Sequence, residues 1–410
     1  MHTDVNAQAV DFDVVIAGGG LVGSSLACAL DGSGLRVALI EASAPRQQSP
    51  PSFDERNLAL NRFSLEALSV LGVLPHLASA PARIRGVHVS CAGDFGRVRL
   101  RCEDHGVDAF GGVVVARELG GALQARLDAC SGLALRAPAR VLHAQPQAEA
   151  MALSLDDGSA LRARLLVIAD GSDSALREQL GLGSEHHDYG QTLFVSVVEA
   201  AREHAGIAYE RFTDEGPVAM LPLAGRRLGS VLTIARERAD AVIALADADY
   251  LELLQQRFGW RLGRLQRVGR RSAYPMRLIT ARQLVGPRCV ALGNAAQTLH
   301  PIGAQGFNLG LRDALTLAGA LRAPGLADPG ASALLQRHAE LRAPDRARTL
   351  DFSDGLARLF THRAAPVRWL RGLGLAAFDH FSDLARPMVR GAMGHDLHAE
   401  AALRLLREAA

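Results

Sequence analysis

The sequence predicts an α/β protein (α+β overall) in which a doubly wound parallel-sheet domain is interrupted by a mostly antiparallel β-sheet domain and followed by a helical C-terminal tail. Two observations predict this architecture. Near the N-terminus an apolar strand runs into a glycine-rich turn and a helix, as in the first unit of a doubly wound sheet. A block of short strands follows between residues 192 and 234, and helical patterns prevail from about residue 350.

The length of the chain favours two packed domains. It has 410 residues, of which 49% are apolar, so it is too long for one compact core and can bury two. No sequence repeat and no long linker divides it. We expect residues 1–83, 110–183 and 276–345 to form the doubly wound domain, residues 84–109 and 184–275 the sheet domain, and residues 346–410 the C-terminal helices.

The composition excludes several classes of function. A formal net charge of +2 gives no reason to expect a nucleic-acid partner. All 45 basic residues are arginine, which excludes Schiff-base and P-loop chemistry that needs a lysine. The five cysteines are scattered and form no C-x-x-C pair, which argues against a disulfide framework and against a metal site. A reducing cytoplasm fits this pattern.

No segment has the character of a membrane span or a signal peptide. Residues 14–30 are uncharged, but the stretch is short for a span and carries four glycines, which suit a strand, turn and helix better. Met1–Asp11 lacks a cationic region. We therefore expect a cytoplasmic protein whose contact with the inner face of the membrane, if present, is peripheral.

The elements of the doubly wound domain follow in order. Phe12–Ala17 is predicted to be a buried parallel strand, Leu21–Leu30 the helix after it, and Arg36–Ile40 the second strand. Leu161–Ile168 and Arg288–Leu292 are further short apolar runs of the strand type, each followed by a turn that contains glycine.

The sheet domain begins with a strand-like alternation from Ile84 to Leu100. A turn is expected at Gly216-Pro217, and a helix from Gly310 to about Leu321. Further strands are expected at Leu193–Val198, Tyr209–Phe212, Val218–Leu223 and Ser230–Ile234, and amphipathic helices around Leu356–Phe360 and Trp369–Phe378.

The first chemical motif is Gly18-Gly19-Gly20-Leu21-Val22-Gly23, a G-x-G-x-x-G pattern between a strand and a helix. Such glycines let backbone amides approach a pyrophosphate at the positive end of the helix. Glu41 ends the second strand, where its carboxylate can accept both hydroxyls of a ribose and disfavours a 2′-phosphate. A tight turn is the alternative for a lone glycine pattern, but here the strands, helix and acid all have the spacing of a dinucleotide site.

Two later motifs follow apolar strands. Asp170-Gly171 stands after Leu161–Ile168, where an ordinary turn explains the pair as well as a binding loop does. Residues 293–313 (GNAAQTLHPIGAQGFNLGLRD) run from a strand through a glycine-rich loop into a helix. The free amides of such a loop suit an anionic or electron-rich edge of a ligand, and the length of this loop argues against a purely structural cap.

These three motifs, in this order, resemble those of the single-component aromatic hydroxylases among the flavoprotein monooxygenases. The third resembles the signature of the ubiquinone-biosynthesis hydroxylases. The resemblance covers nearly the whole chain and is weakest past about Gly394. Further stretches resemble the members that act on 2-polyprenyl-6-methoxyphenol, namely Glu210–Thr213, Gly216-Pro217, Ala219–Pro222, Phe258–Gly263, Arg271–Pro275 and Gly293–Gln297.

The resemblance implies an FAD-binding Rossmann-like domain with noncovalent FAD. It places Arg56 on the pyrophosphate and Arg117 as a second cofactor contact, with a solvated surface role as the alternative for each. His300 is the one candidate for a general base, and ordering of the loop is its favoured alternative. The cofactor-binding residues are then Gly18, Gly20, Gly23, Glu41, Arg56, Arg117, Asp170, Gly171, Gly293, Asn294, Pro301, Gln305, Gly306, Phe307 and Asn308, and the candidates for the substrate cavity, for which sheet core is the alternative, are Phe212, Met220 and Pro222.

Two positions depart from the group's pattern. Asn294 stands where an Asp is usual, which matches the narrower resemblance, and its amide can still bond a ribityl hydroxyl. Gly303-Ala304 stands where Ala-Gly or Gly-Gly is usual, so Ala304 is strained if its position needs a positive φ.

The resemblance also implies the reaction. NAD(P)H, bound transiently, reduces FAD, and one oxygen atom of O2 enters 2-polyprenyl-6-methoxyphenol para to its hydroxyl, in ubiquinone biosynthesis and in contact with other enzymes of that pathway. A halogenase is disfavoured because its chemistry is associated with a lysine. The alternatives left open are a hydroxylase of another ring position or another phenol, and a non-catalytic flavoprotein scaffold of the biosynthetic complex.

Overall fold

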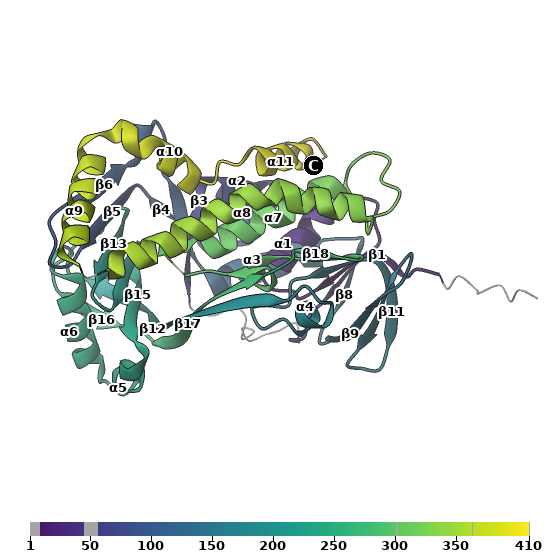
Figure 1. Ribbon diagram of the computed structural model, residues 1–410, viewed down its shortest axis with the longest axis horizontal. Helices are drawn as coiled ribbons and strands as arrows, with labels where there is room; N and C mark the ends of the chain where they lie inside the picture. The colour runs from purple at the N-terminus through teal and green to yellow at the C-terminus, as the bar shows by residue number, and fades with distance from the viewer. Residues whose placement is uncertain (1–8, 45–55, 301, 363, 410) are drawn as a thin grey trace, which may run out of the picture.

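The computed structural model describes residues 9–44, 56–300, 302–362 and 364–409, and shows helices packed on three sheets (Figure 1). The first sheet has eight strands. Its centre is a run of parallel strands, β19 (Cys289–Ala291), β11 (Ala160–Ile168), β1 (Phe12–Ala17), β2 (Val37–Ile40) and β8 (Leu133–Arg136). The strands β18 (Val285–Gly286), β10 (Met151–Leu155) and β9 (Val141–Pro146) complete it in antiparallel pairings.

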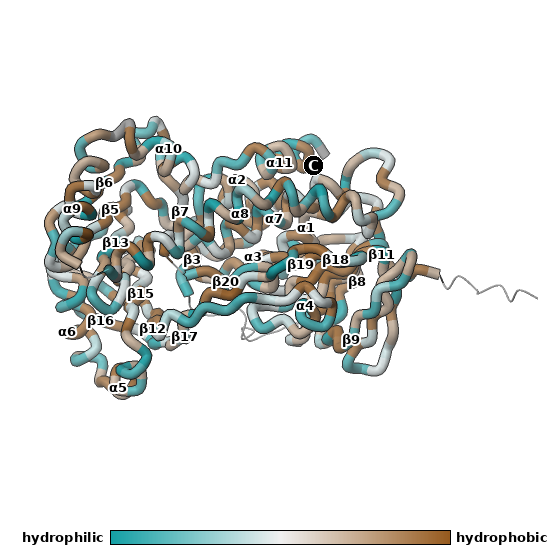
Figure 2. The backbone as a smooth tube through the Cα atoms, in the orientation of Figure 1, coloured by the Kyte–Doolittle hydropathy of each residue, from teal (hydrophilic) through white to brown (hydrophobic). Residues whose placement is uncertain are grey.

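The central stretches of β1, β2, β11 and β19 are apolar because both of their faces are buried. Val14 and Ile16 of β1 pack in one core with α1 (Leu21–Leu30) and α7 (Gln305–Leu321). Val15 and Ala17 pack on the opposite face in a second core with β10 and α4 (Ala175–Gln179). Figure 2 shows hydrophobic stretches concentrated in the strands around β18 and β19.

The second sheet has nine strands and is mostly antiparallel. One face is covered by α5 (Ala239–Ile243) and α6 (Asp247–Phe258), and we call the opposite face, which looks toward the first domain, the inner face. The strands run in the order β20 (Gln297–Thr298), β17 (Ser272–Ala281), β12 (Ser184–Ala200), β15 (Arg227–Ala235), β14 (Gly216–Pro222), β13 (Ile207–Thr213), β5 (Gly86–Cys91) and β6 (Arg97–Arg101), with β16 (Leu265–Val268) beside β12.

A small third sheet lies between the two large ones. Its strands are β3 (Asn57–Asn61), β7 (Gly111–Val115) and β4 (Ala82–Ile84), followed in the chain by helices that pack on the first domain, α2 (Arg62–Val70) after β3 and α3 (Ala116–Asp128) after β7. The 30-residue helix α8 (Ser332–Thr361) contacts α7 and β18 of the first domain and β13 and β14 of the second (Figure 1). It therefore packs against both the first and the second sheet.

The C-terminal helices pack in two separate places. The helices α9 (Ala365–His380) and α10 (Ser382–Ala392) lie against the second sheet, whereas α11 (Leu397–Ala409) returns to α7. A Cβ atom on Gly319 of α7 would stand 2.9 Å from that of Ala402, so a glycine is what allows the two helices to approach this closely. Buried side chains of α11 belong to the same core as α1 and α7.

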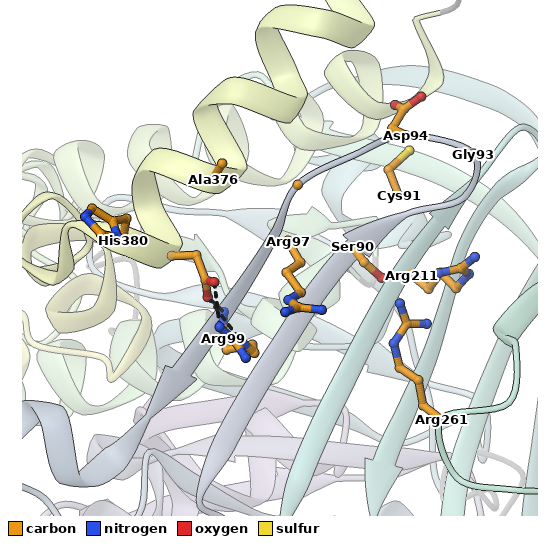
Figure 3. Close-up of a pocket in the computed structure, with 12 residues that line it drawn as sticks. Ser90, Cys91, Gly93, Asp94, Arg97, Arg99, Arg211, Arg261, Ala376 and His380 are labelled. Atoms are coloured by element: carbon orange, nitrogen blue, oxygen red, sulfur yellow. Dashed lines mark hydrogen bonds and ion pairs between the residues drawn. The ribbon is translucent and has the colours of Figure 1, made fainter.

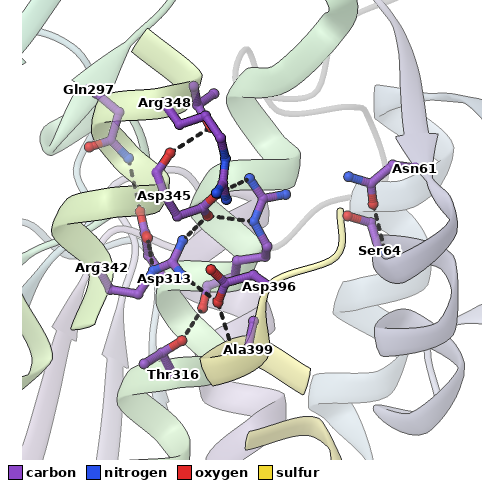
Figure 4. A network of polar contacts seen from close by, with 12 residues as sticks. Asn61, Ser64, Gln297, Asp313, Thr316, Arg342, Asp345, Arg348, Asp396 and Ala399 are labelled. Atoms are coloured by element: carbon purple, nitrogen blue, oxygen red, sulfur yellow. Dashed lines mark hydrogen bonds and ion pairs between the residues drawn. The ribbon is translucent and has the colours of Figure 1, made fainter. Parts of the chain in front are cut away.

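A buried ionic network joins α7, α8 and the segment before α11 (Figure 4). Arg342 donates to Asp313 at 2.6 Å and to Asp396 at 3.0 Å, and it also pairs with Asp345. Arg312 donates to Asp345 at 2.7 Å. All five side chains are at least nine-tenths buried, so each charge depends on its partners.

The fold class predicted from the sequence is confirmed, and the boundaries of several elements differ. The helix expected from Gly310 begins at Gln305, because Gly306 lies within its first turn and does not break it. The turn expected at Gly216-Pro217 lies just before it, and Gly216 already begins β14. The first strand of the sheet domain is divided into β5 and β6, and β12 extends over 17 residues.

Candidate cofactor and substrate site

Four of the predicted motif positions lie at one edge of the first sheet. Gly18 follows β1, Glu41 follows β2, Asp170 follows β11 and Gly293 follows β19. These strands are adjacent and parallel, so their carboxyl ends meet at the same edge. In open α/β sheets a ligand binds in the crevice outside this edge.

The glycine turn after β1 is shaped for close approach. Gly18 has φ of +109°, and a Cβ there would meet the carbonyl oxygen of Ala169 at 2.3 Å. A Cβ on Gly23 would stand 2.0 Å from the carbonyl oxygen of Gly18, so helix and strand can touch only at a glycine. Gly20 differs, because a Cβ there would meet nothing within 4 Å.

This turn fits a pyrophosphate. Gly20 is the N-cap of α1 and offers no side-chain hydrogen bond, and the first turn of the helix contains no acidic residue. The amides at this helix start are therefore available to an anion, and the open space at Gly20 is where one would lie. The structure thus supplies the ligand space and the donors that FAD requires.

Glu41 anchors the turn. Its carboxylate accepts hydrogen bonds from the backbone N–H of Gly19 at 2.7 Å and from that of Ser43 at 2.8 Å. The acid expected to hold a ribose thus also joins the end of β2 to the glycine turn.

The Asp170 loop borders the same crevice. Asp170 keeps contact with solvent, while the surrounding protein raises its pKa, an effect opposed by a hydrogen bond with Ser174. Gly171 has φ of +105° and open space at its Cβ position. Asn294 is exposed in the loop after β19, so its amide is accessible to a ligand.

The third motif opens α7 through two left-handed residues. Gly303 has φ of +70° and Ala304 has φ of +51°, so the strain anticipated for Ala304 is present. Gly306 has open space at its Cβ position and Phe307 is half-buried, whereas Gln305 is buried. Pro301 lies outside the described residues.

Asn308 uses its side chain within the protein. The amide oxygen accepts from the backbone N–H of Asn61 at 3.0 Å, and the amide nitrogen donates to the carbonyl oxygens of Ala59 at 2.9 Å and Ala304 at 2.8 Å. It therefore ties the start of α7 to β3, and any contact of this residue with the isoalloxazine ring would come from its backbone.

The two candidate arginines lie together at the start of the third sheet. The backbone N–H of Ala116 donates to the carbonyl oxygen of Arg56 at 2.8 Å, which brings Arg117 beside Arg56. The guanidinium carbon of Arg56 lies 5.3 Å from the centroid of the Tyr274 ring on β17. Both arginine side chains are exposed.

His300 is placed in the core. Its side chain is 2% exposed, and burial lowers its pKa to about 4, so the imidazole is neutral at pH 7. The ring lies edge-on against Tyr189, with centroids 5.1 Å apart, and its Nδ1 accepts from the backbone N–H of Ile302 at 3.4 Å. These contacts order the loop, which was the favoured alternative to a base.

The three substrate candidates lie in different surroundings. Phe212 points to the inner face, where its ring stacks on Phe360 of α8 with centroids 3.7 Å apart. Met220 is fully buried on the opposite face, in the core beneath α6. Pro222 is buried at the end of β14.

Glu210 has no role among the predicted site residues, although it lies in the stretch Glu210–Thr213 that carries part of the resemblance. It lies on β13 between the inner-face residues Ala208 and Phe212. Its cross-strand neighbours are Ala219 on β14 and Val89 on β5. An acid flanked at i−2 and i+2 by apolar residues in a strand was the available signal.

Comparisons with known proteins agree with this geometry. The model of the FAD binding domain family matches residues 11–353. The ubiquinone hydroxylase UbiL of Rhodospirillum rubrum is 37% identical over 386 residues, covering 93% of this chain and 89% of that protein. The 3-demethoxyubiquinol 3-hydroxylase of Escherichia coli (strain K12) is 28% identical, covering 93% of this chain and 98% of that protein. The crystal structure of p-nitrophenol 4-monooxygenase PnpA from Pseudomonas putida DLL-E4 shares the fold, with a TM-score of 0.75 at 16% identity, covering 93% of this chain and 98% of that chain.

Proposed function

Because this chain belongs to the FAD binding domain family and is a flavoprotein monooxygenase, we propose that it hydroxylates a 2-polyprenyl-6-methoxyphenol para to the phenol hydroxyl, within ubiquinone biosynthesis. The observation that carries the proposal is the similarity to a ubiquinone hydroxylase over nearly the whole chain, together with a glycine turn at the start of α1 that has room and free backbone amides for a pyrophosphate.

The residues of the chain then have the following roles. The start of α1 would hold the pyrophosphate, and Glu41, at the end of β2, would accept the hydroxyls of the adenosine ribose. Asp170 and Asn294 bind the ribityl chain, and the loop before α7 borders the isoalloxazine ring. When bound, FAD reduced by NAD(P)H supplies the activation of O2. The inner face of the second sheet orients the phenol and excludes water.

The ring position follows from the substrate's own chemistry. The phenol oxygen donates electron density to the ortho and para carbons. One ortho carbon carries the prenyl chain and the other the methoxy group, so para is the open activated site. The prenyl tail leaves through an apolar channel between the second sheet and the flavin.

A second candidate is hydroxylation at another ring position. It is favoured by the E. coli relative, whose name assigns it position 3 of demethoxyubiquinol. Purified holoenzyme given NAD(P)H, a short-chain 2-prenyl-6-methoxyphenol and labelled O2 separates the two candidates. Label on a new para hydroxyl supports the proposal, and label at the meta position supports the second candidate. A bound flavin that is never reduced by NAD(P)H would instead support a scaffold.

We also propose peripheral contact with an anionic membrane, since a polyprenyl substrate is too apolar to travel freely in water. Among the residues that the structure describes, none of the helices combines the length and apolar character needed to span a bilayer. The structure does carry an exposed apolar ridge on α9 and α10. It consists of Trp369, Leu370, Leu373, Phe381, Leu384 and Met388.

A basic cavity adjoins this ridge (Figure 3). Its volume is about 810 Å³, and α9 supplies Ala376 and His380 to its wall. Arg97, Arg211 and Arg261 point into it, and no carboxylate of the described part of the chain pairs with them. Burial and the neighbouring Arg211 lower the pKa of Arg261, so an anion would relieve the repulsion. Such a cavity beside an apolar ridge matches a bilayer with anionic headgroups.

A further inference from the structure

Glu210 is the acid at the centre of the inner face. It lies on β13 directly opposite Ala219 of β14 and Val89 of β5, with Ala208 and Phe212 two residues away on the same side. These four neighbours are apolar, and Ala208 and Phe212 pack against the helices that cover this face. An ionisable group in such a setting needs a partner or a function.

The carboxyl group of Glu210 has no partner in the described structure, where neither a hydrogen bond nor an ion pair reaches it. The side chain is nevertheless half-buried rather than sealed, as are those of Val89, Ala219 and Leu221 around it. All four lie beneath a covering layer, since α8 packs on β13 and β14 and β4 packs on β14. Because these half-buried side chains keep contact with solvent beneath that layer, we infer a largely apolar space beside Glu210 of the kind that a substrate ring fills.

This space adjoins the loop assigned to the flavin ring. Phe212 belongs to the same apolar cluster as Ile302, which lies in the loop that opens α7. Residues two apart on a strand are separated by roughly 7 Å. Glu210 thus lies two residues along β13 from a side chain that shares an apolar cluster with this loop.

The electrostatics suit proton transfer. Burial raises the pKa of Glu210 to about 8, and no neighbouring charge offsets the effect. The titratable groups on the elements packed nearby are Cys91, His300, Asp354 and Arg371. The Cys91 thiol is neutral because burial raises its pKa to about 11, His300 is neutral with a lowered pKa, and Arg371 is paired with Asp94. The Tyr189 hydroxyl donates a hydrogen bond to the Asp354 carboxylate at 3.0 Å. A carboxyl group that titrates near the working pH is what general acid–base catalysis needs.

We propose that Glu210 is a catalytic residue that binds the hydroxyl of the phenol substrate and accepts its proton during hydroxylation, an inference that rests on the proposed function. The O–H bond breaks toward oxygen, and its electron pair becomes a phenolate lone pair that enriches the para carbon. The carboxylate becomes the acid. After the para carbon has gained a hydroxyl group from the oxidant that reduced FAD and O2 supply, it loses its hydrogen as a proton to water, the ring regains aromaticity, and Glu210 returns its proton to the phenol oxygen.

The test compares holoenzymes carrying Glu210→Gln and Glu199→Gln. Glu199 lies on β12 of the same sheet in surface ion pairs with Arg226 and Arg267, so it controls for a lost carboxylate. Glu210→Gln is expected to retain FAD and to lower the rate of phenol hydroxylation by 100-fold or more at pH 8. The group that titrates near pH 8 should vanish from its rate profile. A phenol of lower pKa should restore part of the rate, while Glu199→Gln should match the wild type.

A binding measurement separates this inference from the proposed function. Affinity for a simple 2-methoxyphenol, followed by the flavin spectrum, should rise through pH 8 in the wild type and stay level in Glu210→Gln. That result supports the role of Glu210 even if the wild type fails to hydroxylate the phenol, an outcome that would refute only the proposed function. Equal pH profiles for binding and rate in the two variants would overturn the role of Glu210 and leave the hydroxylase assignment standing.

Discussion

Arg342 and Asp313 form a 2.6 Å ion pair in which the arginine side chain is fully buried and the carboxylate nearly so. The pair joins α8 to α7, the helix that begins at the flavin loop. Taking two charges out of water is costly, and here the cost is offset because further partners surround each group. The position of α7 therefore depends on a network in which the loss of any member leaves a buried charge without a partner.

Arg342→Met should destabilise the protein by about 3–5 kcal/mol, because it leaves three buried carboxylates without their shared cation. Arg337→Met is the matched control on the same helix. Its partner Glu340 and Arg337 itself are both 66% exposed, so its loss should cost no more than about 1 kcal/mol. Unfolding in denaturant measures both. A similar loss of unfolding free energy in the two variants would contradict the conclusion that the buried network stabilises the fold more than a surface ion pair does.

Acid should weaken the same network. Burial alone would raise the pKa of Asp345, but Arg312 and Arg342 lower it to about 2. A depressed folded-state pKa gives stability that is present above the ordinary pKa near 4 and lost as the pH falls toward 2. The expected loss is roughly 2 kcal/mol. The free energy of unfolding, measured between pH 2 and 6, should therefore fall less steeply with acid in Asp345→Asn than in the wild type. Equal slopes in the two proteins would contradict the lowered pKa of Asp345.

Ala304→Gly should stabilise the protein by about 0.5–1 kcal/mol, because a left-handed conformation is costly for alanine and free for glycine. The gain is reduced by the greater freedom of glycine in the unfolded chain. Ala320→Gly, at a right-handed position in the last turn of α7, should instead cost about 0.5 kcal/mol. Thermal unfolding of the two variants should move in opposite directions, and destabilisation by both would show that position 304 does not require a positive φ.

Gly20→Val should yield a folded protein that has lost its flavin. A side chain at position 20 meets no protein atom within 4 Å, so the substitution acts on the ligand space and not on the core. Gly121→Val, at an equally open and exposed glycine of α3, should keep its FAD. Flavin absorbance per protein and circular dichroism decide the matter. If Gly20→Val bound as much FAD as the wild type, the pyrophosphate could not lie at the start of α1.

Substitution of Leu370→Glu and Leu373→Glu together should abolish binding to phosphatidylglycerol vesicles, since both side chains are more than half exposed on the apolar ridge. Arg97→Ala should weaken binding and its dependence on salt. Leu397→Glu, at an exposed leucine of α11, is the control and should bind as the wild type does. Vesicle co-sedimentation is the assay. Equal binding to uncharged phosphatidylcholine would rule out the anionic component.

The first unit of the fold was predictable because its constraints are local. The clash that any side chain at Gly23 would make with Gly18 involves residues five apart, and a sequence motif records such a contact. The start of α7 is less predictable, because the glycine-rich stretch before Gly310 favours a loop. In the structure only Gly303 needs the freedom of glycine, while Gly306 is helical.

The candidate site was predictable to the same extent. The gathering of Glu41, Asp170 and Gly293 follows once their strands are parallel and adjacent. The apolar surroundings of Glu210 do not follow from the sequence, because they depend on the strand register that places Ala219 and Val89 beside it. The strand β5 lies more than 100 residues earlier in the chain than β13. The return of α11 to α7 is equally non-local, so the sequence predicts the C-terminal helices but not where they pack.

The packing of α11 on α7 bears on how the protein is made. The strand β1 and helix α1 leave the ribosome well before α11, yet the core they share with α7 is completed only when Ala399, Leu403 and Leu406 have been made. Contacts this distant in the chain form slowly and leave apolar surface uncovered meanwhile. A nascent chain of this protein must therefore keep the faces of α1 and α7 from aggregating until synthesis has passed residue 400. Its yield in cells will be governed by chaperone capacity during translation as much as by the stability of the finished fold.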